Sequence, residues 1–179
     1  MASQSPRRRQ ILSNAGIPFE VRAAEVDESV QAGESPVEYV RRLARMKAFA
    51  VPMNAGEIIL AADTTVVVDG EILAKPEDER DARRMVQMLS GRTHIVLTAI
   101  CLRHSGGEIV DCESTLVRFV ELSTEEVAAY AASGEPQDKA GAYAIQGLAS
   151  KYIDRIEGCY FNIVGLPISM VWKHLRTLE

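Results

Sequence analysis

The sequence lacks any apolar run long enough to cross a membrane. Its longest apolar stretches, IILAADTTVVV and HIVLTAICL, contain polar residues and are typical of strands. Nothing in it resembles a signal peptide. Only three cysteines are present, an odd number without metal-ligand spacing, and they are interpreted most simply as reduced thiols. We therefore expect a cytoplasmic protein without a membrane partner.

The sequence also lacks an excess of positive charge. Its 20 Lys and Arg against 25 Asp and Glu give a formal net charge of −5 at pH 7, whereas nucleic-acid-binding domains are usually basic. No internal repeat, linker or low-complexity run interrupts the 179 residues. A chain of this length can bury a hydrophobic core without disulfide bonds or metal ions. We expect a single domain, residues 1–179, and no nucleic-acid partner.

Helical and strand patterns alternate early in the chain, and strands cluster later. Helices are predicted at residues 5–15, 35–51, 77–91 and 123–134 and after residue 167, the second and fourth opened by capping boxes. Strands are predicted at residues 18–24, 57–63, 93–104 and 108–120, with a hairpin that turns at residues 69–70. This order predicts an α/β or α+β fold in which helices flank a mixed central β-sheet, in two lobes.

Three arginines, Arg7, Arg8 and Arg9, fall in the first turn of the first predicted helix. The helix dipole disfavours positive charge at that end, although Ser3 or Ser5 can cap the helix. Two interpretations remain open. The cluster is either a solvated helix end, the usual fate of a charge cluster, or a site where free amides and guanidinium groups bind a polyphosphate.

Acidic and basic side chains surround the strand predicted at residues 57–63. Asp63 ends that strand, where sites of α/β proteins usually lie, although Asp is also common there as a turn residue. Lys75 precedes Pro76, so we expect its backbone to be extended. Its side chain either belongs to a site or is that of a plain surface lysine. Glu28, with Asp27 as an equal candidate, lies in a loop. An acid near Asp63 would help to hold Mg²⁺ beside phosphate, whereas most loop acids are only solvated.

A glycine-rich region covers residues 139–167, KAGAYAIQGLASKYIDRIEGCYFNIVGLP. Glycines at this density permit tight turns and close backbone approach. Gln146 stands among them with an amide that can bind a base edge through one donor and one acceptor. A loop-rich structural corner is the alternative interpretation.

Three segments together resemble the Maf family of nucleoside triphosphate pyrophosphatases. They are SQSPRR at residues 3–8, AADTTVVVDGEILAKP at residues 61–76, and the late pair KAGAYAIQG and IEGCYFNIVGLP; LARMKA and LSGRTHIVLT also resemble family segments. The match runs in order from Ser3 to Pro167. It implies a Maf/inosine triphosphatase-like fold with a cleft between two lobes. It also implies hydrolysis between the α and β phosphates of a nucleoside triphosphate, which gives the monophosphate and pyrophosphate.

The resemblance also implies roles for individual residues. Asp63 is the general base that activates water, and Glu28 joins it in binding a divalent metal, Mg²⁺ or Mn²⁺. The residues that match substrate-binding positions are Ser3, Arg7, Arg8, Lys47, Lys75 and Gln146. Those that match positions used to sort substrates are Arg7, Thr64 and Gln146. A glutamine in this motif belongs to the branch that acts on dTTP and UTP. The early arginines would then face a triphosphate, with Arg9 as a solvated bystander.

Other functions fit parts of the sequence. One is a pyrophosphatase of the same fold that prefers 7-methyl-GTP or another modified nucleotide, against which Gln146 argues. Another is a regulator of septum formation that binds nucleotides without useful turnover; the intact Asp63, Lys75 and Glu28 weigh against it. A nucleic-acid module is disfavoured by the acidic balance and the lack of interleaved aromatics. The resemblance also allows a homodimer.

Overall fold

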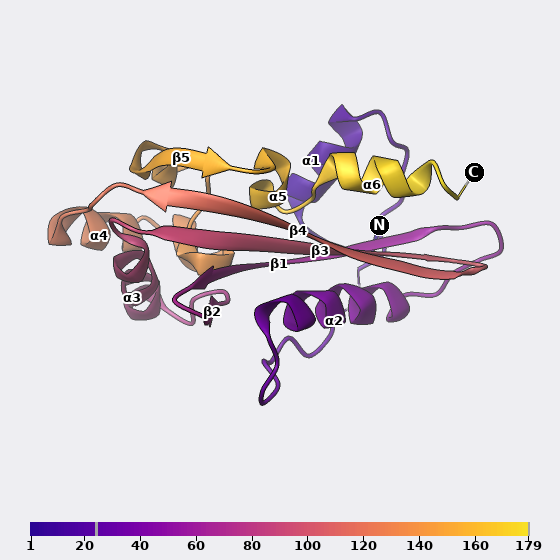
Figure 1. Ribbon diagram of the computed structural model, residues 1–179, viewed down its shortest axis with the longest axis horizontal. Coiled ribbons are helices and arrows are strands. Elements are labelled where there is room, and N and C mark those ends of the chain that lie inside the picture. The colour runs from indigo at the N-terminus through magenta and orange to yellow at the C-terminus, as the bar shows by residue number, and fades with distance from the viewer. Residues whose placement is uncertain (24, 179) are drawn as a thin grey trace. The chain divides into compact units, whose positions relative to one another are not determined.

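The computed structural model describes residues 1–23 and 25–178, and it contains helices and one five-stranded β-sheet (Figure 1). The helices are α1 (Pro6–Asn14), α2 (Pro36–Phe49), α3 (Glu79–Leu89), α4 (Thr124–Ala131), α5 (Tyr160–Val164) and α6 (Ile168–Leu175). The strands are β1 (Ile59–Val68), β2 (Glu71–Leu73), β3 (Thr93–His104), β4 (Gly107–Phe119) and β5 (Ile153–Glu157). The predicted α+β class is confirmed.

The five strands lie in the order β2-β1-β3-β4-β5. β1 and β2 pair antiparallel across the turn of Asp69 and Gly70, whose φ angles of 51° and 81° suit a tight hairpin. β4 and β5 also pair antiparallel. The sheet is antiparallel where the sequence predicted a mixed one. Short turns join β1 to β2 and β3 to β4, whereas a parallel pair needs a long crossover.

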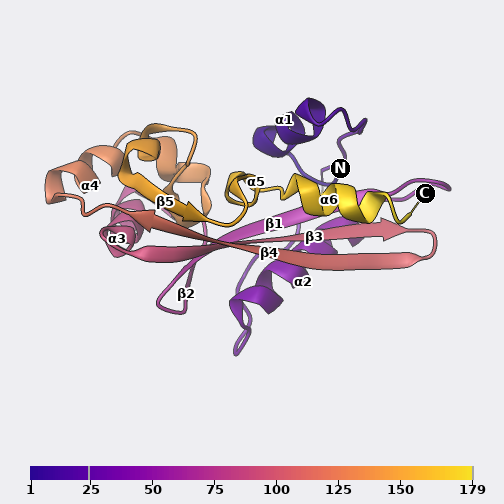
Figure 2. The same ribbon diagram turned by 45° about the horizontal axis from the view of Figure 1, so that its top comes forward.

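The chain forms two compact units. The first consists of Met1–Thr64, Thr98–Glu113 and Phe161–Glu179. Within it, α2 lies on one face of the strands, and α1 and α6 lie on the other, as Figure 2 shows. The predicted capping box of α2 is present, with Ser35 and Glu38 bonding each other's backbone amides. Val40, Leu43 and Ala44 of α2 are fully buried, so this helix contributes its apolar face to the core.

The second unit consists of Thr65–Leu97 and Ser114–Tyr160. Its α3 packs against α4; α3 begins at the N-cap Asp78, and α4 begins at the predicted capping box of Ser123. Three buried rings, those of His94, Phe119 and Tyr143, meet edge to face with centroids 5.0–5.3 Å apart. Burial lowers the pKa of His94 to about 4, so the ring in this core is neutral at pH 7.

The strand predicted at residues 18–24 is wrong for its described part, residues 18–23; residue 24 lies outside the described residues. The amide of Ala2 donates to the Leu60 carbonyl (2.7 Å) and that of Arg22 to the Met1 carbonyl (3.1 Å). Residues 1–2 therefore lie between this segment and β1. The sequence does not predict β5, because its residues Asp154, Arg155 and Glu157 give no apolar alternation.

No helix in the described ranges 1–23 and 25–178 is long and apolar enough to cross a membrane. The three cysteines are all free thiols.

Candidate active site

The sequence predicted Asp63 at the end of a strand. The structure places it inside β1 instead. β1 continues for five residues beyond it, because the following TTVVV run consists of β-branched residues that favour a strand. Only 6% of the Asp63 surface is exposed. A carboxylate so deeply buried needs a charged or hydrogen-bonding partner.

Lys47 supplies that partner from the last turn of α2. Its Nζ lies 2.6 Å from Asp63 Oδ1 and 2.6 Å from Glu28 Oε1, so one ammonium group joins both carboxylates. The loop that carries Glu28 is held in turn by Tyr39, whose hydroxyl donates to the Glu28 carbonyl (2.9 Å). Three of the predicted site residues, distant in sequence, therefore meet in one cluster of the first unit.

The structure distinguishes Glu28 from its neighbour Asp27, which the sequence left as equal candidates. Asp27 Oδ1 accepts a hydrogen bond from the amide of Ser29 (2.9 Å) and so stabilises a local turn. Glu28, in contrast, reaches Lys47. The geometry therefore favours Glu28 as the partner of Asp63.

The electrostatic setting of Asp63 favours its protonated form. Burial raises the pKa of this carboxyl group, and the nearby Glu28 adds to the effect. The charges of Lys47 and Arg8 oppose the rise without cancelling it. A carboxylate with a raised pKa accepts a proton more readily than an ordinary aspartate, as a general base must.

Arg8 is half-buried and joins three segments of the chain through hydrogen bonds. Its Nε donates to the Gly165 carbonyl (2.7 Å), and its Nη1 donates to Ser3 Oγ (3.2 Å) and to the Ala62 carbonyl (2.8 Å). Its Nη2 donates to Thr64 Oγ1 (3.1 Å). Four of the five N–H donors of a guanidinium group are thus used within the protein. Contact between Arg8 and phosphate stays a prediction, and the structure adds a role in positioning that the sequence did not suggest.

The start of α1 is capped and positively charged. Ser5 is the N-cap, and its side chain accepts from the Arg8 amide (3.4 Å), which decides between the two serines considered as caps. No acidic residue lies in the first turn. Arg7 is half-buried and Arg9 is exposed. The charge of these arginines is therefore not offset by acids of the same turn, as an anion site would require.

Lys75 and Gln146 belong to the second unit, and both are exposed. The loop of Gln146 is organised by Glu135, whose carboxylate accepts from the amides of Leu148 (2.8 Å) and Ala149 (3.4 Å). A Cβ on Gly147 would lie 2.0 Å from Glu135 Oε2, so a larger residue at this position would displace the Glu135 carboxylate. Sequence reasoning missed Glu135, because no local pattern links it to a loop ten or more residues later.

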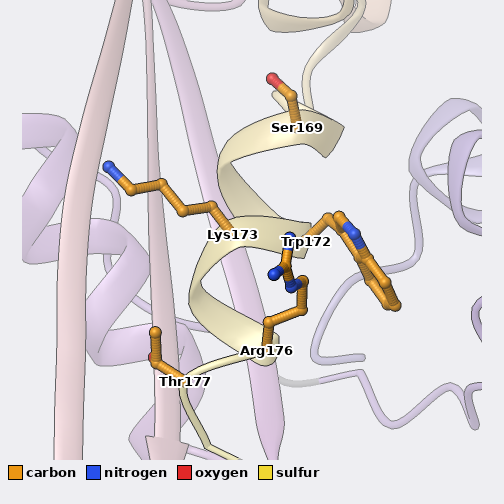
Figure 3. Close-up of a pocket in the computed structure, with 5 residues that line it drawn as sticks. All are labelled: Ser169, Trp172, Lys173, Arg176 and Thr177. Carbon is orange, nitrogen blue, oxygen red and sulfur yellow. The ribbon is translucent and has the colours of Figure 1, made fainter.

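A surface pocket lies elsewhere, along α6, with a volume of about 460 Å³. Its lining residues are Ser169, Trp172, Lys173, Arg176 and Thr177. In Figure 3, Trp172 and Arg176 extend from the same side of the helix and Lys173 from the opposite side. This lining holds no carboxylate, so it offers no general base of the kind that Asp63 provides.

The chain resembles known proteins over nearly its whole length. Residues 1–178 match the family model described as Maf-like protein. Among curated relatives, the dTTP/UTP pyrophosphatase of Koribacter versatilis is 50% identical over 177 residues, which cover 98% of this chain and 92% of the relative. That of Symbiobacterium thermophilum is 52% identical over 169 residues, 94% of this chain and 87% of the relative. That of Anaeromyxobacter sp. is 50% identical over 181 residues, with coverage of 98% and 87%.

Proposed function

The chain belongs to the Maf-like protein family, and from this premise we propose that it hydrolyses dTTP and UTP to their monophosphates and pyrophosphate. The observation that carries the proposal is the buried Asp63 inside β1, which shares the ammonium group of Lys47 with Glu28. The proposal agrees with the name dTTP/UTP pyrophosphatase, which relatives about half identical over nearly the full chain carry. We further propose that residues 1–179 work as one domain in the cytoplasm, where the three free thiols stay reduced.

In the proposed reaction, Asp63 accepts a proton from the water molecule that attacks the α-phosphate. Burial raises the pKa of Asp63 and favours this transfer, while the charge of Lys47 opposes that rise in pKa. Lys47 also keeps positive charge beside the reacting group, where it offsets the negative charge of the substrate. Arg7, Arg8 and Lys75 are the further cations that we propose for the phosphates.

Glu28 and Asp63 fit a divalent metal ion, Mg²⁺ or Mn²⁺. Their oxygens converge on a single cationic nitrogen at 2.6 Å, so the pair is already arranged around one positive charge. No group of three or more His, Cys, Asp or Glu suited to a metal occurs in the described part of the chain. Substrate oxygens and water would complete the ligand set, as is usual for Mg²⁺. A bound metal supplies charge neutralisation and a lower pKa for its water.

We propose that Arg7, Thr64 and Gln146 determine which nucleotide the site accepts. Of these, Thr64 follows Asp63 directly in β1 and is half-buried in the first unit. Gln146 offers one donor and one acceptor from an exposed loop. We expect this amide to favour pyrimidine nucleotides over 7-methyl-GTP.

The test is pyrophosphate release from dTTP, UTP, CTP, 7-methyl-GTP and the purine triphosphates, with Mg²⁺, with Mn²⁺ and with chelator. We expect metal-dependent turnover that is highest on dTTP and UTP. A preference for 7-methyl-GTP would refute the substrate assignment and keep the reaction class. Tight nucleotide binding without turnover of any substrate would refute the proposed pyrophosphatase activity and favour a regulatory protein.

A further inference from the structure

A chain of hydrogen bonds runs away from the candidate active site through the first unit. Arg8 Nη2 donates to Thr64 Oγ1 (3.1 Å), which lies 2.9 Å from Thr98 Oγ1. Thr98 Oγ1 in turn donates to the Asn162 carbonyl (2.9 Å). Thr98 lies on β3, is fully buried and has no role in the assignments made so far. We call Arg8, Thr64, Thr98 and the Asn162 carbonyl the threonine relay.

Only one arrangement of the two hydroxyl protons satisfies all three hydrogen bonds. A guanidinium group only donates, and a carbonyl oxygen only accepts. The single hydroxyl proton of Thr98 is therefore used on Asn162, so Thr98 can only accept from Thr64. The hydroxyl proton of Thr64 must point toward Thr98.

This direction limits what Thr64 can offer to a substrate. Its proton goes to Thr98, and one lone pair receives Arg8. A hydroxyl oxygen has two lone pairs, so one remains. Thr64 is half-buried, whereas Thr98 is completely enclosed. Thr64 can therefore accept a hydrogen bond from a bound nucleotide but cannot donate one.

We propose that Thr98 is a positioning residue that holds the Thr64 hydroxyl as an acceptor, so that the site selects nucleotides by a donor group placed there. The proposal rests on the proposed function, and it specifies how Thr64 sorts substrates. The donor that both proposed substrates share, and that cytosine lacks, is the imide N3–H of uracil and thymine. A site built to bond a donor discriminates strongly against the analogue that lacks it.

The test compares Thr98→Val with Thr98→Ser. Valine keeps the shape of threonine but removes the acceptor, so the Thr64 hydroxyl becomes free to rotate and to donate. Steady-state kinetics on UTP, CTP and dUTP give two ratios of kcat/KM: UTP to CTP reports the N3–H, and UTP to dUTP, both of which carry the N3–H, is the internal reference. We expect Thr98→Val to move the UTP to CTP ratio at least about fivefold toward unity and to leave the UTP to dUTP ratio unchanged. Thr98→Ser, which keeps the hydroxyl, should restore the UTP to CTP ratio.

Thr65→Val is the matched control. Thr65 is adjacent in β1 and just as buried, but its Oγ1 has no hydrogen-bond partner among the described residues. The same isosteric change there removes no bond, so both ratios should stay at the wild-type values. A purely structural role of Thr98 would lower stability and leave the ratios unchanged.

The outcomes separate this inference from the proposed function. Wild-type protein that turns over none of the nucleotides would refute the proposed function. Active wild-type protein with a Thr98→Val ratio of UTP to CTP within twofold of wild type would refute the role of Thr98 alone. If Thr98→Val does not fold, NMR of the wild-type protein provides the test. The hydroxyl protons of Thr64 and Thr98 should both exchange slowly, and a Thr64 hydroxyl proton too fast to observe would overturn the relay.

Discussion

Replacing Asp63 by asparagine should remove most of the catalytic activity and make the protein more stable at pH 7. Asparagine has nearly the shape of aspartate but carries no charge, so the cost of burying a carboxylate disappears. Lys47 keeps Glu28 as a partner in the variant and is not left as an isolated buried charge. Loss of a general base lowers kcat by about 10²–10⁴-fold.

The gain in stability follows from the pKa of Asp63, which burial raises above its ordinary value of 3.8. Between the unfolded and the folded pKa, the folded state binds the proton more tightly, so the free energy of unfolding falls as pH rises through that window. Each unit between the two values corresponds to about 1.4 kcal/mol. At pH 7 the wild type has lost the full free energy that corresponds to this pKa difference, whereas Asp63→Asn, which has no carboxyl group to titrate at this position, has not.

Two measurements check the argument against each other. Urea denaturation of both proteins at pH 7, and at the lowest pH at which both stay folded, gives the difference in free energy of unfolding. NMR titration of the Asp63 carboxyl group gives the folded pKa, from which the same difference can be calculated. The two values should agree.

Glu57→Gln is a control of opposite sign. Arg22 binds Glu57 through two bonds of 2.6 and 2.7 Å and lowers its pKa to about 2. The ionised form is therefore favoured in the folded state, and this stability is present above the ordinary pKa and lost in acid. Glu57→Gln should lose stability at pH 7. An Asp63→Asn variant less stable than wild type at pH 7 would refute the reasoning, because Lys47 would then more than offset burial. Near-normal turnover would remove Asp63 as the base.

Three further predictions follow from buried polar groups. Lys47→Met should cost about 3–5 kcal/mol at pH 7, because Asp63 and Glu28 lose their shared cation; the loss should shrink at pH 5 in urea denaturation, and an equal loss at both pH values would contradict it. Thr65→Val should raise the free energy of unfolding by about 1 kcal/mol, because it removes a buried hydroxyl without a partner among the described residues; a lower melting temperature would refute this. His94 has a pKa lowered to about 4, so the unfolded state binds the proton first and about 3 kcal/mol of stability should be lost as pH falls from 6.5 to 4; His94→Phe should flatten that dependence in denaturation measured across this range.

Local structure was largely predictable from the sequence. The capping boxes at Ser35 and Ser123 and the turn at Asp69 and Gly70 are all present where their residue patterns placed them. Caps and turns depend on residues within about four positions of one another, so their signals are complete in a short window. β5 was missed because pairing with β4 makes it a strand, and its own charged sequence does not.

Motifs that resemble one family identified Asp63, Glu28, Lys47 and the early arginines as candidate site residues. The contacts of these residues depend on the folded chain. The tertiary structure placed Asp63 inside β1, gave Lys47 two carboxylates, and enclosed Arg8 among protein acceptors. The partners of Arg8 at positions 62 and 165 lie 54 and 157 residues along the chain. The pKa of Asp63 and the proton direction in the threonine relay depend on such distant contacts, which form only when the chain has folded.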